Sequence, residues 1–318
     1  MLVRFIFAIC ICFSPYSFAG KTSLSLAILS YNPDVNTVVL YQSILNEMSE
    51  QLSEYEFELT VLDTETLLKE STYHDFDFFL LDPVSFLTLR SIGVVGGTLG
   101  TLSRGDGSLS ANLMGGVIIQ RKEKPIIALQ DIHKYYIAVS SPHYLENYIA
   151  QAFELETLGY LKPALDKLSL YESPEAVVES VASGQQEIGF VRTGVIERLV
   201  NQNRLQAGDV QILNAQHLAG YPFMVSTRLY PEWVFVANAK ISSEVTRSVA
   251  SALLALKVGG ESSYQYGVHG FAPPLSYMPV EEVLKALDIP PYDEAPLSWW
   301  RVFSQYIWYF GLVTAAVC

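Results

Sequence analysis

Residues 187–200 of the chain read EIGFVRTGVIERLV. The part from Glu187 to Val191 is apolar and rich in strand-forming residues, which is typical of a short buried strand. From Gly194 to Val200 the apolar residues recur at helical spacing. The dipeptide Arg192-Thr193 lies between the two parts. The stretch therefore predicts a strand-to-helix unit with an arginine and a threonine at the point where the strand ends.

The same alternation of strand-like and helical stretches recurs from Lys21 to Ser298. It indicates an α/β fold built from βαβ units around parallel or mixed sheets. Strands are predicted at 24–30, 57–62, 76–81, 115–119, 136–139, 187–191, 211–213 and 233–238. Helices are predicted at 35–52, 142–157, 176–182, 194–200 and 243–258. No repeat and no low-complexity linker interrupts the pattern, which favours two lobes that share chain crossings over independent domains.

A glycine-rich stretch lies before the second half of this pattern. Residues Gly93 to Gly107 include six glycines but lack the Gly-Lys-Ser/Thr ending of a phosphate-binding loop. We therefore expect a flexible connection there. A crossing between the lobes is expected at 220–222, where the sequence Gly-Tyr-Pro interrupts the pattern.

The composition excludes several classes of protein. Of the 318 residues, 50% are hydrophobic and 17% are charged, so the chain is neither disordered nor collagen-like. Its length corresponds to about two domains. The 20 Lys+Arg and 33 Asp+Glu residues give a net charge of −13. Because binding to a nucleic acid backbone needs a basic surface, nucleic acid is excluded as a partner.

Both ends of the chain have the patterns of membrane-directed segments. Residues 1–19 combine Arg4, an apolar run and small residues before a cut after Ala19, which predicts a secretory signal peptide. Residues 299–318 begin with two tryptophans and have no charged residue after Arg301. This predicts a transmembrane helix that is either cut short or a tail anchor. A buried terminal strand and a docked helix are the respective alternatives. All three cysteines lie in these two segments, so no disulfide is expected in the body.

Four strand-to-helix junctions have polar or aromatic side chains that can meet a ligand. In open α/β sheets a ligand binds beyond the carboxyl ends of the strands, where helix N-termini favour anions. The candidate binding residues are Tyr31, Asp82, Ser140, Ser141, His143, Tyr144, Arg192 and Thr193. The junction at 140–144 is the best anion candidate, because Ser141 can cap a helix that begins at Pro142.

The sequence leaves two alternatives open at these junctions. Ser141 and Thr193 can simply cap helices, which is the commoner role of any single residue of this kind. Arg192 can pair with a bound oxyanion or with a carboxylate of the protein, such as Glu197 or Asp82.

No arrangement of residues typical of an enzyme is present. The five histidines, at 74, 133, 143, 217 and 269, are scattered and form no metal-binding spacing. Neither Ser183 nor Ser226 lies in a nucleophile-elbow pattern. The body is therefore interpreted as a binding domain that is not an enzyme and uses no cofactor or metal.

Four segments together resemble one family. They are GGVIIQRKEKPIIALQDI (115–132), SVASGQQEIGFVRTGVIERL (180–199), STRLYPEW (226–233) and YGVHGFAPPLSYMPVEEVLKALDIPPY (266–292). The sequence resembles the phosphate/phosphite/phosphonate-type periplasmic binding proteins, in the form used as the extracytoplasmic sensor of bacterial histidine kinases, including tetrathionate sensors. The resemblance implies a type II periplasmic binding protein fold, in which two α/β lobes close on a ligand in the cleft between them.

The resemblance also implies a division of the chain. The expected parts are a signal peptide at 1–19, the first part of lobe I at 20–114, lobe II at 115–219, the return of lobe I at 220–298 and a transmembrane helix at 299–318. The body is expected in the periplasm, anchored to the inner membrane.

The expected ligand is a small anionic solute. Cleft closure would then signal to a cytoplasmic histidine kinase region, as part of a homodimer. The alternative is the substrate-binding component of a phosphonate-type ABC transporter. The sequence Pro-His-Tyr at 142–144 departs from the small Ser/Gly pattern of phosphonate-binding members, so a different oxyanion or an organic ligand stays open.

Overall fold

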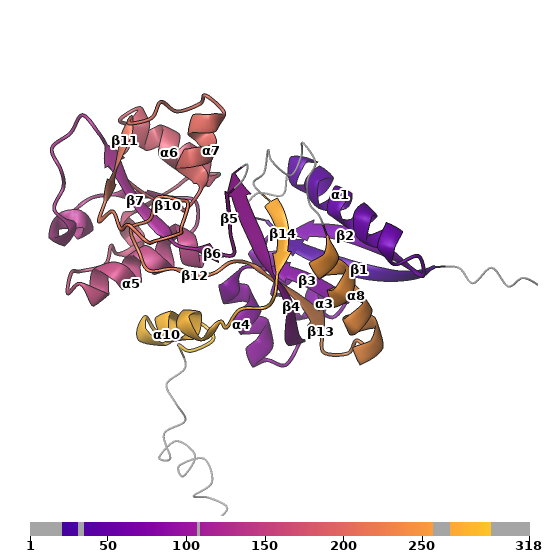
Figure 1. The fold of residues 1–318 in the computed structure, drawn as a ribbon. Helices are drawn as coiled ribbons and strands as arrows, with labels where there is room; N and C mark the ends of the chain where they lie inside the picture. The colour runs from indigo at the N-terminus through magenta and orange to yellow at the C-terminus, as the bar shows by residue number, and fades with distance from the viewer. Residues whose placement is uncertain (1–20, 31–34, 107–108, 257–267, 294–318) are drawn as a thin grey trace, which may run out of the picture.

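The computed structural model of the chain describes residues 21–30, 35–106, 109–256 and 268–293. In these residues two β-sheets, each covered by helices, lie side by side and are joined by a pair of short strands (Figure 1). The predicted α/β fold is confirmed. The expected signal peptide (1–19) and transmembrane helix (299–318) lie outside the described residues. Within the described ranges, no helix has the length and apolar character needed to cross a membrane.

The larger sheet contains, in the described part of the chain, the strand order β14-β4-β13-β3-β1-β2, with β5 paired to β4. Its strands are β1 Thr22–Leu29, β2 Tyr55–Leu62, β3 Phe78–Leu81, β4 Val95–Asp106, β5 Leu109–Ala111, β13 Val234–Asn238 and β14 Val268–Ala272. Its helices are α1 Val35–Gln51, α2 Thr64–Leu67, α3 Glu70–Tyr73, α4 Pro83–Ser91 and α8 Ser243–Ala255. β1 runs parallel to β2 and β3, whereas β13 runs antiparallel between β3 and β4. We call this sheet and its helices the larger lobe.

β1 shows why the larger sheet forms. Successive residues of a strand point to opposite faces of a sheet. Leu26 and Ile28 lie beside Ile44 and Leu45 of α1, around one small internal space. Ala27, on the other face, is also buried. A strand that is covered on both faces is expected to be apolar at successive positions, as β1 is.

The glycine-rich stretch at 93–107 is not the flexible connection expected from the sequence. It contains β4, which spans 12 residues and pairs with β13, β14 and β5. A Cβ atom at Gly100 would lie 3.0 Å from the side chain of Leu253 in α8. The register of β4 against β13 also shifts near this point. Glycine therefore serves here to admit a closely packed helix and a bulged ladder.

The smaller sheet has, among the described residues, the order β11-β7-β10-β8-β9. Its strands are β7 Gly116–Arg121, β8 Ile137–Val139, β9 Leu168–Leu170, β10 Ile188–Arg192 and β11 Val210–Leu213. Its helical segments are η1 Leu129–Lys134, η2 Leu145–Ile149, α5 Ala150–Thr157, η3 Leu165–Lys167, α6 Pro174–Ala182 and α7 Val195–Asn201. The strand and helix predicted at 187–200 are β10 and α7. We call this sheet and its helices the smaller lobe.

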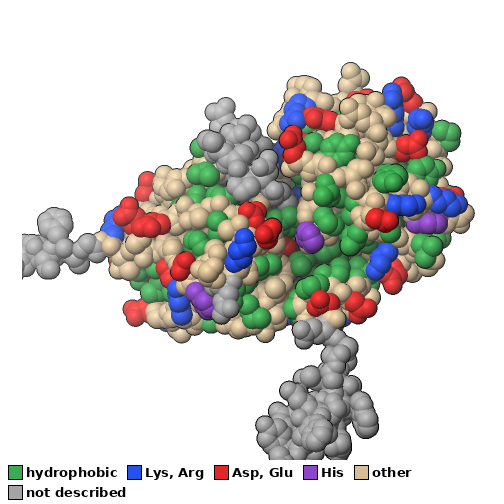
Figure 2. Space-filling view, turned by 180° about the vertical axis from the view of Figure 1, so that it is seen from behind, with side chains coloured by type: hydrophobic (Ala, Val, Ile, Leu, Met, Phe, Trp, Pro, Cys, Tyr) green, Lys and Arg blue, Asp and Glu red, His purple; other side chains and the backbone are tan. Residues whose placement is uncertain are grey.

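The two passages of the chain between the lobes are paired with each other. β6 (Leu113–Met114) leads into the smaller lobe, β12 (Tyr230–Pro231) leads out of it, and the two strands are antiparallel. The expected crossing at 220–222 is wrong, because the chain after β11 folds back through a bridge between Gln216 and Val225 and stays beside the smaller sheet. Figure 2 shows the two lobes from behind, in broad contact with each other.

The last described helix lies across the junction of the lobes. α10 (Met278–Ala286) follows β14 and packs against α4 of the larger lobe, α5 of the smaller lobe and β12 between them (Figure 1). α10 therefore contacts both lobes and one of the two strands that connect them.

Candidate functional site

Three of the four predicted junctions are described by the structure. The fourth contains Tyr31, which lies outside the described residues. The three junctions follow β3, β8 and β10, and their side chains meet the boundary between the lobes in different ways.

Asp82 follows β3 and caps α4. Its Oδ1 accepts hydrogen bonds from the backbone N–H groups of Val84 (2.8 Å) and Ser85 (3.2 Å). The residue is only 1% exposed, and its Oδ2 has no hydrogen-bond partner among the described residues. Burial raises the pKa of Asp82 to about 6, against the opposing effect of the hydrogen bonds from Ser85 and Val84. The start of α4 is thus occupied by a carboxyl group of the protein itself.

The junction after β8 begins differently from its sequence-based prediction. Ser141 does not cap a helix that begins at Pro142, because its hydroxyl accepts the backbone N–H of His143 (3.2 Å) and closes a local turn. The helix begins only at Leu145, as the π-helical segment η2, and Tyr144 at its N-cap position makes no side-chain cap. His143 is exposed, whereas the Ser140 hydroxyl is buried without a hydrogen-bond partner in the described part of the chain.

Tyr144 reaches the larger lobe. Its hydroxyl shares a hydrogen bond of 2.7 Å with Oγ1 of Thr64 in α2. Its ring stacks on that of Trp233, with the ring centroids 6.4 Å apart and the planes inclined by 11°. Burial, with a contribution from the Asp82 charge, raises the pKa of Tyr144, so the hydroxyl stays protonated. The Ser140–Tyr144 junction therefore lies where the two lobes meet.

Thr193, in the junction after β10, does not cap a helix either. The N-cap of α7 is Gly194, whose φ of 86° suits glycine. The Thr193 hydroxyl instead accepts hydrogen bonds from the N–H of Gly115 (3.3 Å) and the hydroxyl of Tyr221 (2.9 Å). It holds the start of β7 and the segment after β11 together.

Arg192 is paired with carboxylates that the sequence did not indicate. It is 6% exposed, forms a short hydrogen-bonded ion pair with Glu232 and lies 3.8 Å from Oε1 of Glu146. The sequence left open a bound oxyanion or a protein carboxylate as the partner, with Glu197 and Asp82 as examples of the carboxylate. Glu197 instead accepts the backbone N–H of Met224 at 2.6 Å, and Asp82 caps α4.

Burial and the neighbouring charges act on the pKa values of Arg192 and Glu146 in opposite ways. Burial acts to lower the pKa of Arg192, but the carboxylates of Glu232 and Glu146 outweigh it and raise this pKa. Burial raises the pKa of Glu146, and the nearby Arg192 opposes that rise.

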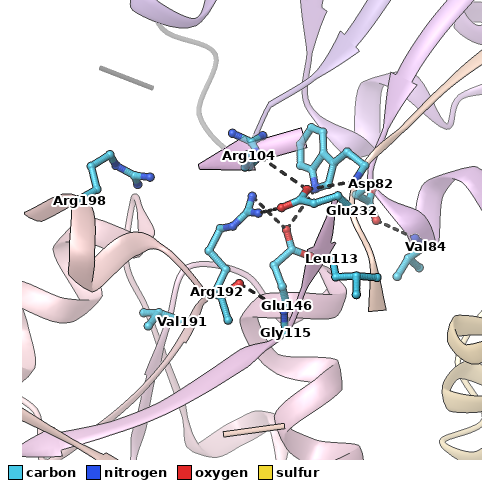
Figure 3. Close-up of polar contacts among 12 residues, drawn as sticks. Asp82, Val84, Arg104, Leu113, Gly115, Glu146, Val191, Arg192, Arg198 and Glu232 are labelled. Carbon is cyan, nitrogen blue, oxygen red and sulfur yellow. Dashed lines mark hydrogen bonds and ion pairs between the residues drawn. The ribbon is translucent and has the colours of Figure 1, made fainter. Parts of the chain in front are cut away.

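Arg104 and Trp233 complete this cluster from the larger lobe. Nε of Arg104 lies 3.6 Å from Oε2 of Glu232, and its guanidinium carbon lies 5.8 Å from the centre of the Trp233 ring. Nε1 of Trp233 donates to Oε1 of Glu146 at 3.2 Å. Figure 3 shows Arg192 and Glu146 converging from the smaller lobe on Glu232, with Arg104 on its far side. We call Arg104, Glu146, Arg192, Glu232 and Trp233 the interlobe cluster.

The interlobe cluster has consequences for an anionic ligand. It contains two arginines and two glutamates, so each buried cation already faces a carboxylate. An anion that approaches Arg192 must therefore compete with Glu232. In the described residues, no group of three His, Cys, Asp or Glu side chains is arranged to hold a metal ion.

A groove of about 380 Å³ lies elsewhere, at the β11 edge of the smaller sheet. It is lined by the residues 126–129 and 211–214. None of the junction residues or cluster residues lines it. The contacts between the lobes that involve junction residues, Tyr144 with Thr64 and Arg192 with Glu232, include no residue of this groove.

A family model for the periplasmic substrate-binding protein of phosphonate ABC transporters matches residues 26–276. The chain belongs to this family. A curated relative, the tetrathionate sensor histidine kinase TtrS of Salmonella typhimurium, is 23% identical over 292 residues, which make up 89% of this chain and 46% of the relative. The chain thus spans about half the length of this relative. The predicted resemblance to phosphonate-type binding proteins and to sensor kinases is confirmed.

Solved structures of family members have the same fold. A binding protein component of an ABC phosphonate transporter from Pseudomonas aeruginosa has a TM-score of 0.62 and 15% identity, over 87% of this chain and 91% of that chain. PhnD1 of Prochlorococcus marinus, solved in complex with methylphosphonate, has a TM-score of 0.61 and 15% identity, over 84% and 98% of the two chains. This likeness confirms the periplasmic binding protein fold.

The phosphonate-binding family consists of solute-binding domains, which agrees with the interpretation of the body as non-catalytic. Within this member, the sequence analysis missed Glu146, Glu232, Trp233 and Arg104. One signal was present: Glu232 stands directly before the apolar run that forms β13, inside the segment STRLYPEW that supported the family resemblance. A charge at such a position is expected to be buried and paired.

Proposed function

We propose that the chain is the solute-binding sensor region of a membrane-bound histidine kinase, located in the periplasm. A small anionic solute binds between the larger and smaller lobes and favours their closure. The observation that carries this proposal is the contact of the Ser140–Tyr144 junction with the larger lobe, through the 2.7 Å hydrogen bond between Tyr144 and Thr64. A ligand at this junction would touch both lobes, and its preference for the closed form would shift the population.

The same junction is followed by the helix start that we assign to an anion. The start of α4 is occupied by Asp82, and α7 has Glu197 in its first turn. No side chain caps η2, and Glu146 in its first turn is committed to Arg192 and Trp233. Free N–H groups at a helix start favour anions. We therefore place the solute at the start of η2, near the Ser140 hydroxyl, which has no hydrogen-bond partner among the described residues.

The other predicted binding residues have supporting roles in this proposal. Tyr144 and Asp82 flank the solute from opposite lobes, and Ser141 and His143 shape the entrance. Tyr31, which lies outside the described residues, stays a predicted binding residue. Arg192 and Thr193 position the crossing strands beneath it. The division of the chain into a first part of lobe I, lobe II and a return to lobe I, with the return at β12 rather than at residue 220, belongs to the same proposal. So do the membrane anchor at 299–318 and the homodimer.

The relative supports the kinase context. Its name describes a tetrathionate sensor histidine kinase, and the match covers 89% of this chain but only 46% of the relative. The rest of such a protein would provide the kinase. For this chain, a sulfur or phosphorus oxyanion is the class of solute to test first.

The test is a titration of the full chain with tetrathionate, methylphosphonate, phosphate and sulfate, followed by thermal unfolding and solution scattering. We expect a true ligand to raise the free energy of unfolding by about 2.7 kcal/mol at one hundred times its Kd, and to reduce the radius of gyration. Ser140→Ala should weaken this effect, whereas Ser251→Ala, at an exposed position of α8 in the larger lobe, should not. If no anion in the panel shifted either quantity, the proposal would be wrong.

A second candidate is the capture component of a phosphonate uptake system. The family description and both solved neighbours favour it. The genes beside the coding sequence separate the two candidates: a kinase or response regulator supports the sensor, and a permease with an ATPase supports uptake.

A further inference from the structure

Glu232 is bonded through every polar group that it has. Its N–H donates to the carbonyl of Asn112 (3.0 Å), directly before β6. Its Oε1 binds Arg192 of the smaller lobe, and its Oε2 accepts the N–H of Trp233 at 3.0 Å. Its carbonyl accepts the hydroxyl of Tyr277 at 2.6 Å. The residue is 1% exposed, so none of these bonds can be exchanged for one with solvent.

Two of these bonds lead to different parts of the molecule. The carboxylate side leads to Arg192 and, through it, to Glu146 at the start of η2. The carbonyl side leads to Tyr277, which is the N-cap residue of α10. Since both groups belong to a single residue, a shift of Arg192 that displaces the backbone of Glu232 also moves the carbonyl that accepts the Tyr277 hydroxyl.

α10 is placed to respond to such a shift. It packs against helices of both lobes and against β12. One further tie is the ion pair between Arg90 of α4 and Glu281, which fixes α10 to the larger lobe independently of Glu232. Of these two polar ties, the hydrogen bond of Tyr277 reaches the interlobe cluster through Glu232, whereas the Arg90–Glu281 pair does not.

We infer that Glu232 couples the contact between the lobes to the position of α10. The inference deepens the proposed sensing function and rests on it: closure on a solute would change the Arg192 contact, and α10 would receive the change. Glu232 is a positioning residue in this scheme, because it acts through Arg192 and Tyr277. Coupling between two sites is reciprocal, so a change at α10 must also be felt at the cluster.

The test measures local amide hydrogen exchange in the full chain without any solute. Tyr277→Phe removes one hydroxyl and leaves the ring in place. We expect exchange to rise by about fivefold, the effect of one lost hydrogen bond, both in α10 and in the remote peptides 145–149 and 190–193. If exchange in α10 rose while the remote peptides kept their wild-type rates, the inference would be overturned.

Arg90→Met is the matched control. It loosens α10 at its contact with α4 but leaves Glu232 and Tyr277 untouched, so it should speed exchange in α10 without affecting 145–149 or 190–193. An equal effect of Arg90→Met on the remote peptides would show that they respond to any loosening of α10, which would also contradict a specific role for Glu232.

Glu232→Gln gives the reverse measurement. It weakens the hold on Arg192 but keeps the carbonyl and the shape of the side chain, and it should speed exchange in α10. In the double variant with Tyr277→Phe, amide exchange in α10 should be no faster than in either single variant, because both substitutions interrupt the same path. Additive effects would overturn the inference, and Tyr277→Phe alone decides it if the glutamine variant does not fold. Solute titration plays no part here, so the sensing proposal and the coupling can fail separately.

Discussion

Asp82 and Arg192 occupy corresponding places in the two lobes, and the protein compensates their charges in opposite ways. Asp82 directly follows the buried strand β3, Arg192 is the last residue of the buried strand β10, and the two residues are 1% and 6% exposed. Asp82 is compensated locally, by the N–H groups of the helix that it begins. Arg192 is compensated by Glu232 and Glu146, which are far from it along the chain.

This difference in compensation determines how each charge contributes to the folded structure. Local hydrogen bonds only partly offset the burial of Asp82, so its pKa rises to about 6 and its negative form is costly. The carboxylates around Arg192 more than offset its burial, and they come from elements that meet only in the folded protein. A buried ion pair of this kind resists the loss of either partner. Asp82 therefore shapes one lobe, whereas Arg192 joins two.

The largest expected effect is that of Arg192→Met. The variant removes the Arg192 cation from the buried carboxylates of Glu232 and Glu146, while Glu232 keeps its longer contact with Arg104. This should lower the free energy of unfolding by about 3–5 kcal/mol. Arg198→Met is the control, because Arg198 pairs with Glu175 within the smaller lobe and their side chains are 28% and 23% exposed. The control should cost about 1 kcal/mol or less. Urea denaturation of both variants measures the difference.

If both arginine variants lost the same free energy of unfolding, the position of Arg192 between the lobes would make no additional contribution to stability. The double variant Arg192→Met with Glu232→Met sharpens the result. It should recover part of the loss, because replacing a buried ion pair by apolar side chains is often neutral or favourable.

The second effect is a pH dependence of stability, which should have opposite signs for the two capping aspartates Asp82 and Asp63. Burial raises the pKa of Asp82 to about 6 from 3.8, so the folded state binds this proton more tightly than the unfolded state. Its contribution to stability is therefore present at low pH and is lost as pH rises from about 4 to about 6, by at most about 1.4 kcal/mol per pH unit. Asp82→Asn should remove this slope in urea denaturation at pH 4 to 7.

Asp63 provides the matched control for this measurement. It caps α2 from an exposed position, and the backbone hydrogen bond from Thr66 lowers its pKa. Its contribution is therefore present above the unfolded pKa and is lost as pH falls. Asp63→Asn should change the pH profile in the opposite sense, and a parallel change in both variants would contradict the comparison.

The contrast between local and distant compensation also explains what the sequence could predict. Strand β10 and helix α7 were predicted to within a few residues, because apolar periodicity is a local property. The cap expected at Ser141 failed because its hydroxyl closes a turn with the next residue but one, a choice that the same sequence permits equally. The glycines of β4 were interpreted as a loop because the helix that they admit, α8, lies far along the chain.

The interlobe cluster is the extreme case. Arg192 was singled out from the sequence, but its partners could not be, since Glu146 and Glu232 approach it only after η2 and the crossing strands are in place. Sequence patterns thus identify where a buried charge stands, and the topology decides what compensates it.

The smallest expected effect concerns single hydroxyl groups. Tyr144→Phe removes the hydrogen bond to Thr64 across the lobes, and Tyr148→Phe removes the bond of 2.6 Å to the carbonyl of Pro163 within the smaller lobe. Each loss should cost about 1 kcal/mol, because the remaining ring still packs. The two variants should differ in where the cost appears. Exchange in α2, which contains Thr64, should rise in Tyr144→Phe and stay unchanged in Tyr148→Phe. If amide exchange in α2 were the same in both variants, the hydrogen bond of Tyr144 would not tie the lobes together. The Ser140–Tyr144 junction would then have no better claim to a ligand site shared by both lobes than the Asp82 junction.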